Sequence, residues 1–401
     1  MPVRKIGFLS LMFAAGALSQ TLTTLYSFTG GADGLHPLGP LVRNAEGQLF
    51  GTTYAGGSKN LGTVFVLTPP SAGGTLWKQT VILNFDGPNG SLPYGAPIQG
   101  GSGALYGTTY YGGSYGYGIV YMLTPPLNAG KNWTFTSLYN FSGPDGEHPA
   151  SGLTEDASGN LYGTSVAGGT LGGGTAFELS PPVEPGGSWT QTILYNFTTT
   201  EQVTSALLFL NGTLYGTTWD DGAFSLSPPA TVGDPWTETV LNPFNVPADG
   251  LNLGQGLITG PGGGLYSSSV QGGIHNNGVV FELSPPTGGT GYWTESILHK
   301  FIGTDGMTGY GGLAFDSAGN LHGFASGGGS TGCSLGCGTI FELKPSTVPG
   351  GIWTSGPLYK FSGPDGYTPL GAPLIRPDGT IYGVTALGGA YNSGTVFQYV
   401  P

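Results

Sequence analysis

The sequence is poor in charge and in cysteine. Charged residues make up 8% of its 401 residues, and two are cysteines, so neither a disulfide framework nor a run of zinc-binding motifs can hold the fold. Only 10 basic residues stand against 22 acidic ones, and this balance excludes nucleic acid and anionic membrane surfaces as expected partners. Beyond the N-terminal segment there is no apolar run long enough to span a membrane.

Glycine and proline are abundant instead, at 78 and 31 residues. Such a share often accompanies disorder, but a 12% aromatic content with little charge argues against a disordered chain. Gly- and Pro-rich turns between short apolar runs are typical of an all-β protein.

Residues 1–19 have the form of a secretory signal peptide. Arg4 and Lys5 precede an apolar stretch over residues 6–18, and small residues mark a cleavage site before Gln20. The stretch is too short for an ordinary spanning helix. We therefore expect a mature chain of residues 20–401 that is secreted, periplasmic or on the cell surface.

A tandem repeat organises the rest of the chain. Its most visible mark is a Trp-Thr pair, or Trp-Lys in the first copy, at Trp77, Trp133, Trp189, Trp236, Trp293 and Trp353. Each unit contains W-T-x-T-x-L-Y-x-F, an F-x-G-P-D-G loop, a short run, L-Y-G-T, a Gly-Gly loop and G-T-A-F-E-L-S-P-P. The apolar residues alternate with a period of two, so we read four strands per unit. Four-stranded units that repeat radially predict a β-propeller.

The phase of the repeat predicts how the ring closes. Leu22–Phe28 matches the outer W-T-x-T strand without its Trp, and Gly394–Pro401 matches the end of the strand before it. The N-terminal strand can therefore complete the last sheet of a single seven-bladed propeller. The predicted blades span residues 29–85, 86–141, 142–197, 198–244, 245–301, 302–361, and 362–401 with 20–28. A linear solenoid is the alternative, but its open ends would need polar caps.

The strand order also sorts the loops onto two faces. The Asp-Gly loops and the Gly-Gly loops emerge on one face, which we call the top face. The hairpin turns and the long loops between Pro-Pro and Trp emerge on the other, the bottom face. The innermost strands begin with small residues such as Gly39, Gly95 and Gly152, as a crowded axis requires.

The repeat resembles the Gloeobacter–Verrucomicrobia (GloVer) tandem repeat. The pattern L-Y-G-T-T, G-G, G-T-V-F-x-L, W-T-x-T-x-L-Y-x-F and G-x-D-G has good copies at Leu105–Pro126, Leu161–Pro182 and Ile381–Phe397, and it covers essentially all of residues 20–401. The resemblance implies an exported bacterial repeat protein and assigns no activity or catalytic residue. Members often end in a sorting or anchor segment; because this sequence stops at its last strand, we expect a secreted or periplasmic form.

The Asp-Gly loops are the first candidate site. Five blades carry Asp33, Asp145, Asp249, Asp305 or Asp365 there, and Asn89 stands in a sixth. Carboxylates beside carbonyl oxygens suit Ca²⁺, but Asp-Gly is also ordinary turn chemistry, and its recurrence in nearly every blade favours the turn. His36 and His148, close behind their Asp, are a weak indication of a metal.

The fourth blade departs from the repeat. Its Asp-Gly loop is replaced by Phe197–Val203, and its Gly-Gly loop is cut to Trp219, Asp220, Asp221 and Gly222. Two altered top-face loops predict a notch in which Trp219 stacks on a sugar ring while the two carboxylates accept hydroxyl hydrogens. The alternative is a tight turn with Trp219 packed on a neighbouring blade.

Four tyrosines crowd the Gly-Gly loop of the second blade, namely Tyr110, Tyr111, Tyr115 and Tyr117. An exposed tyrosine cluster is typical of a binding surface, while packing within the loop is the alternative.

Cys333 and Cys337 lie in an insertion of the sixth blade, and in an oxidising compartment we expect a local disulfide between them.

These features favour a non-catalytic binding or interaction protein without a cofactor, for extracellular carbohydrate or a surface protein. One alternative is a hydrolase or lyase that acts on glycans or lactones at the top-face axis. Another is a structural, self-associating cell-surface protein.

Overall fold

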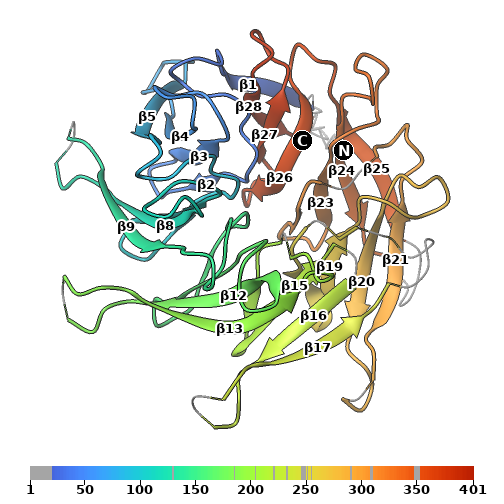
Figure 1. Ribbon diagram of the computed structural model, residues 1–401. Helices are drawn as coiled ribbons and strands as arrows, with labels where there is room; N and C mark the ends of the chain where they lie inside the picture. Colours follow the sequence, from blue (N-terminus) through green and yellow to red (C-terminus); the bar gives the residue numbers. More distant parts are fainter. Residues whose placement is uncertain are drawn as a thin grey trace, which may run out of the picture.

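The protein is a ring of seven four-stranded antiparallel sheets (Figure 1). The computed structural model describes residues 20–401 except 129–130, 185, 204, 220–221, 232–233, 245–249, 251, 254, 290, 308–309 and 347–352. Apart from one 3-10 turn, η1 (Pro261–Gly263), its regular elements are β-strands. The predicted all-β, seven-bladed propeller is therefore confirmed. The predicted signal peptide lies outside the described residues, and no helix within them is long and apolar enough to cross a membrane.

Each blade runs from a strand at the axis to a strand at the rim. The first strands are β2 (Val42–Arg43), β6 (Ile98–Gln99), β10 (Thr154–Glu155), β14 (Leu208–Leu210), β18 (Ile258–Thr259), β22 (Leu313–Phe315) and β26 (Tyr367–Ile375). The second strands are β3 (Leu49–Thr53), β7 (Leu105–Thr109), β11 (Leu161–Thr164), β15 (Thr213–Thr218), β19 (Leu265–Ser268), β23 (Leu321–Ala325) and β27 (Ile381–Leu387). The third strands are β4 (Thr63–Thr68), β8 (Ile119–Thr124), β12 (Gly172–Ser180), β16 (Gly222–Ser227), β20 (Val279–Ser284), β24 (Thr339–Lys344) and β28 (Thr395–Val400). The outer strands are β5 (Lys78–Asn84), β9 (Thr134–Asn140), β13 (Thr190–Thr198), β17 (Thr237–Asn242), β21 (Thr294–Lys300), β25 (Thr354–Lys360) and β1 (Thr21–Ser27).

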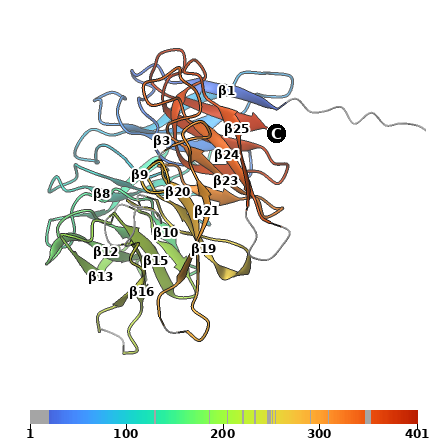
Figure 2. The ribbon, with the colours of Figure 1, turned by 90° about the vertical axis from the view of Figure 1, so that its right-hand side faces the viewer.

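The N-terminal strand closes the ring as the repeat phase predicts. β1 pairs antiparallel with β28, from Thr21 opposite Val400 to Ser27 opposite Thr395. In the side view the start of β1 lies beside the C-terminus (Figure 2), and Leu22 packs into the core that the seventh blade shares with the sixth. The two ends of the propeller therefore lie in one sheet.

The core lies between blades rather than within them. One cluster, for example, joins Phe50 and Phe85 of the first blade to Leu105 and Tyr121 of the second. All five residues of β3 are buried. Because each sheet is covered on both faces, its middle strands are largely buried instead of alternating between buried and exposed residues.

The repeated Trp covers the blade that precedes its own. Five of these indoles contact the Tyr or Phe of that blade's second strand, with ring centroids 5.6–6.3 Å apart: Trp133 with Phe50, Trp189 with Tyr106, Trp293 with Tyr215, Trp77 with Tyr382 and Trp353 with Tyr266. The junction between the sixth and seventh blades differs on both sides. Gln20 stands where β1 would need its Trp, and His322 replaces the tyrosine.

Neighbouring blades meet backbone to backbone at the axis. A Cβ on Gly95 would lie 2.8 Å from the backbone nitrogen of Gly152, and one on Gly39 would lie 2.7 Å from that of Ala96, so glycine is required at these two positions. The hydroxyl of Thr52 donates to the carbonyl oxygen of Gly95 at 3.2 Å. Equivalent bonds to the next blade come from Thr108, Thr164, Thr217 and Ser268.

Candidate functional site

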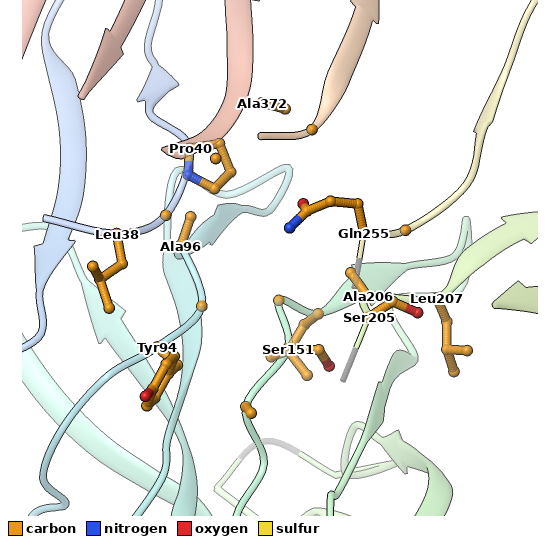
Figure 3. A pocket seen from close by; sticks show the side chains of 18 of the residues that line it. Leu38, Pro40, Tyr94, Ala96, Ser151, Ser205, Ala206, Leu207, Gln255 and Ala372 are labelled. Carbon is orange, nitrogen blue, oxygen red and sulfur yellow. The ribbon is translucent and has the colours of Figure 1, made fainter. Parts of the chain in front are cut away.

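A cavity of about 700 Å³ lies on the axis, and all seven blades line it. Its wall consists of the residues that lead into the first strands, at 38–40, 42, 94–98, 150–153, 205–208, 255–258, 310, 312–313 and 370–372, with contributions from three Gly-Gly loops. Figure 3 shows side chains from different blades facing one shared space. Since these loops belong to the top face, the cavity lies on that side of the ring.

Four aromatic residues stand in the cavity wall. Tyr110 and Trp219 follow β7 and β15, while Tyr94 and Tyr310 precede β6 and β22. The ring centroids of Tyr94 and Tyr110 lie 5.4 Å apart. Those of Trp219 and Tyr310 lie 6.4 Å apart, and the planes of these two rings are within 24° of parallel. Tyr94 and Tyr310 are each 40% exposed, so ring surface is available to a ligand.

The described lining residues include no Asp, Glu, Lys, Arg or His. The Ser205 hydroxyl already donates to the carbonyl oxygen of Thr217, and the Ser151 hydroxyl is bonded to Thr164. Gln255 differs, because its side-chain amide points into the cavity (Figure 3) and makes no hydrogen bond to a described residue. The cavity therefore offers apolar walls, aromatic faces and few free polar groups.

The hydroxyls of Tyr94 and Tyr110 in this wall stay protonated. Burial is the main cause that raises the pKa of Tyr94 above its usual value, and the neighbouring Tyr54 hydroxyl is the second. Burial also raises the pKa of Tyr110, with the neighbouring Tyr111 as the second cause. Both side chains are therefore neutral hydrogen-bonding groups at physiological pH rather than bases.

The predicted tyrosine cluster divides in the structure. Tyr110 lines the cavity and stacks on His148, with ring centroids 4.7 Å apart and planes 6° from parallel. Tyr111 and Tyr117 pack edge-on against His148 and support that pair. Tyr115 is 62% exposed and is not part of the wall.

Trp219 lies in the cavity wall, partly buried, with its backbone N–H donating to the carbonyl oxygen of Gln202 at 2.8 Å. It faces Tyr310, two blades away along the ring. Asp220 and Asp221, its predicted partners, lie outside the described residues.

Sequence reasoning missed Tyr94, Tyr310 and Gln255. The two tyrosines belong to no cluster in the sequence. A signal was present, however, since each stands just before the small residues at the axis, where other blades have Leu38, Ala150 and Leu370.

The aspartates of the Asp-Gly loops act within their turns. Asp33 accepts the Thr29 N–H at 2.8 Å and the Tyr26 hydroxyl at 2.9 Å. Burial and the bond to this carboxylate raise the pKa of Tyr26. Equivalent pairs are Asp145 with Tyr139, Asp305 with His299 and Asp365 with Tyr359. Asn89 likewise accepts the Asp86 N–H at 2.7 Å, whereas Asp249 lies outside the described residues.

The altered loop before the fourth blade keeps this chemistry. Glu201 accepts the N–H of Thr198 at 2.6 Å, three residues earlier, as Asp145 accepts that of Ser142. The substitution therefore changes the residues of the loop but retains its carboxylate-closed turn.

The two histidines of the weak metal candidate are not brought together. His36 and His148 belong to the first and third blades, and both have positive φ, at 55° and 59°. Their Nδ1 atoms contact the carbonyl oxygens of Ala386 and Tyr110 at 2.8 and 2.9 Å. Each ring therefore links its loop to the preceding blade.

Cys333 and Cys337 are joined by a disulfide with their Cα atoms 5.1 Å apart. Cys337 is fully buried in the core between the sixth and seventh blades. The bond closes a short loop of the sixth blade on the top face.

Comparison with known families gives one match. The family model described as the Gloeobacter/Verrucomicrobia repeat matches residues 71–228 and 224–401. No curated protein matches the sequence.

Solved structures resemble the chain in fold. The β-propeller domain of Cps50 (Swd1) from Myceliophteria thermophila is 10% identical, with 95% of this chain and all of that one covered and a TM-score of 0.53. A protein provisionally assigned as a gluconolactonase is 12% identical, with 96% and 92% covered and a TM-score of 0.43. A luciferin-regenerating enzyme is 13% identical, with 95% of each chain covered and a TM-score of 0.45. At such identities the likeness concerns the fold alone.

Proposed function

The chain belongs to the Gloeobacter/Verrucomicrobia repeat family, and from the axial cavity we propose that it is an exported binding protein for neutral carbohydrate. The ligand enters from the top face and lies against the aromatic wall. Binding uses no metal or other cofactor.

The uncharged, aromatic wall carries this proposal. Trp219 and Tyr310 present nearly parallel ring faces, while Tyr94 and Tyr110 stand elsewhere in the same wall. A pyranose ring has an apolar face of C–H groups that packs on an aromatic ring and a rim of hydroxyls that needs a few polar partners. Gln255 and the tyrosine hydroxyls supply those partners. A charged ligand would lose its hydration without a counter-charge among the described lining residues.

An enzyme acting on glycans or lactones is the second candidate. General acid–base catalysis needs titratable groups that converge on one point. Among the described lining residues these are tyrosines, two of which have raised pKa values. A self-associating surface protein is the third candidate, and static light scattering over a concentration series separates it from the other two.

The test is a thermal-shift scan of residues 20–401 against neutral oligosaccharides and polysaccharides, with and without EDTA. A ligand that binds only the folded state raises the melting temperature. We expect a saccharide-dependent rise that EDTA does not change and that Trp219→Ala and Tyr310→Ala abolish. Tyr115→Ala, an exposed tyrosine outside the wall, is the matched control and should keep the rise.

Other results assign the protein elsewhere. A rise with Ca²⁺ alone would favour the Asp-Gly loops as a metal site. Turnover of a saccharide or lactone that Trp219→Ala abolishes would favour the enzyme. No shift with any saccharide would overturn the proposal and leave a protein partner or self-assembly.

A further inference from the structure

A histidine with two carboxylates forms a compact group on the bottom face of the sixth blade. Asp316 lies in the turn between β22 and β23, His322 on β23 and Glu342 opposite it on β24. One ligand atom of each lies within 4.8 Å of the others. We propose that these three residues bind a divalent transition metal ion, with zinc as the preferred ion. The site lies on the opposite face from the axial cavity and does not depend on the function proposed above.

The two distances from His322 are close to those of a zinc site. The Nε2 atom of His322 lies 3.1 Å from Oδ2 of Asp316 and 3.8 Å from Oε1 of Glu342. Zinc bound to nitrogen and oxygen at about 2.0–2.1 Å in tetrahedral geometry sets its ligand atoms roughly 3.3 Å apart. Imidazole with two carboxylates is a donor set that zinc accepts, and three protein ligands leave the fourth position to water.

The group is held in place before any ion binds. Oδ1 of Asp316 accepts the backbone N–H groups of Ala318 and Asn320 at 2.9 and 2.8 Å. Oδ2 of Asp316 accepts the side-chain N–H of Asn320 at 2.8 Å. The carboxylate is therefore held in a fixed position.

The third blade shows which part of this group is special. There Asp156, Tyr162 and Glu178 occupy the corresponding positions, and the Tyr162 hydroxyl donates to Oδ2 of Asp156 at 3.1 Å. The third blade therefore has the same two carboxylates without a histidine. In the sixth blade alone a histidine stands at the tyrosine position, and it adds the nitrogen ligand that the repeat lacks.

The surroundings of His322 fit a cation. Gln20 stands where other junctions place an indole over the second-strand ring, so no tryptophan covers this group. His322 is 5% exposed, which keeps the ion in a weakly screened environment. Lys344 acts against a cation, since its ammonium lies 3.0 Å from Oε2 of Glu342 and offsets that carboxylate.

One feature sets an upper bound on the affinity. Nδ1 of His322 is buried without a hydrogen-bond partner among the described residues. A metal-bound histidine usually donates its other N–H to an acceptor, and loss of that partner typically weakens binding about 10–100-fold. We therefore expect affinity well below that of zinc sites whose histidines have such partners.

The test is calorimetric titration of Zn²⁺ into residues 20–401 that have been stripped with EDTA and dialysed. We expect saturable binding of one ion per chain. His322→Tyr restores the residue of the third blade and should weaken binding by at least about 100-fold, beyond the usual effect of an outer-shell change. The matched control is His299→Tyr, which gives that outer strand the tyrosine seen at Tyr139 and Tyr359 and removes another histidine–carboxylate pair.

Two further readouts keep the result independent of folding defects. Co²⁺ in place of Zn²⁺ should give the visible absorption of a tetrahedral site, and this band should disappear in His322→Tyr and Glu342→Gln. At a free Zn²⁺ concentration 100 times Kd the melting temperature should rise by roughly 3 °C in the wild type. Either variant should keep its circular dichroism spectrum and lose the rise.

The proposal is overturned if the wild type shows no saturable binding at one ion per chain. It is also overturned if His322→Tyr binds as tightly as the wild type, or if His299→Tyr is the variant that loses the ion. In those cases His322 is only a hydrogen-bond donor to Asp316, as Tyr162 is to Asp156.

Discussion

The Tyr121 hydroxyl is an unfavourable polar group of the described core. The side chain is fully buried between the first and second blades, and its hydroxyl has no hydrogen-bond partner among the described residues. Burial raises the pKa of this hydroxyl, so it stays protonated. The corresponding position of the other blades is phenylalanine, at Phe65, Phe177, Phe224, Phe281, Phe341 and Phe397. Tyr121→Phe therefore removes one oxygen and restores the residue of the repeat.

The expected effect is a gain in stability. A buried polar group without a partner costs about 1–3 kcal/mol, and the loss of a few dispersion contacts offsets part of the gain. We expect a net increase of about 1–2 kcal/mol in the free energy of unfolding. With an unfolding entropy of roughly 2.1 cal/mol/K per residue over residues 20–401, the melting temperature should rise by about 1–3 °C.

Tyr162→Phe is the matched control, since it makes the same chemical change where the hydroxyl donates to Asp156 at 3.1 Å. It should lower the stability by about 0.5–1.5 kcal/mol. Both variants are measured by urea denaturation followed by circular dichroism. A Tyr121→Phe protein no more stable than the wild type would refute the reasoning, because the hydroxyl would then have a partner such as a buried water.

Three other predictions concern the ligand site, the axis and the turns. Trp219→Ala should weaken saccharide binding at least about tenfold, as loss of a binding hot spot does, while Tyr115→Ala should leave the Kd unchanged in the same titration. Gly95→Ala should destabilise the fold by about 1–3 kcal/mol because its Cβ meets the next blade at 2.8 Å. Gly152→Ala is the control: the atom nearest to its Cβ is 3.8 Å away, so the urea midpoint of this variant should stay close to that of the wild type. Burial raises the pKa of Asp156, but hydrogen bonds from Asn160 outweigh it and lower the value; its contribution to stability is therefore complete above the ordinary Asp pKa of about 3.9 and lost as the pH falls below it. Asp156→Asn should flatten that acid loss in melting curves, and an unchanged acid slope would contradict the assignment.

Sequence reasoning succeeded where the relevant interactions are local or repeated. The four-strand unit and the Asp-Gly turns depend on residues a few positions apart, as in the pairing of Asp33 with Thr29 and Tyr26. Even the altered loop before the fourth blade keeps such a turn through Glu201. Ring closure was predictable as well, because the chain has an additional outer strand before its first blade and lacks the outer strand of its last blade, so the two ends complement each other.

Sequence reasoning failed where single residues from distant repeats meet. Tyr94 and Tyr310 are separated by most of the chain and follow no pattern, yet both line the cavity with Trp219. His322 interrupts the L-Y-G motif, but its meaning depends on Asp316 and Glu342 across two strand pairs and on the absence of an indole at Gln20.

The sequence by itself determined the number of blades, their four strands and the closure by β1, since hydrophobic period, turn chemistry and repeat phase act within one unit or between its copies. Only the tertiary structure decided which residues share a site. A ring brings equivalent positions of every blade to one axis, so residues without any relation in sequence become neighbours, and the few that depart from the repeat give the axial cavity and the bottom-face group their chemistry.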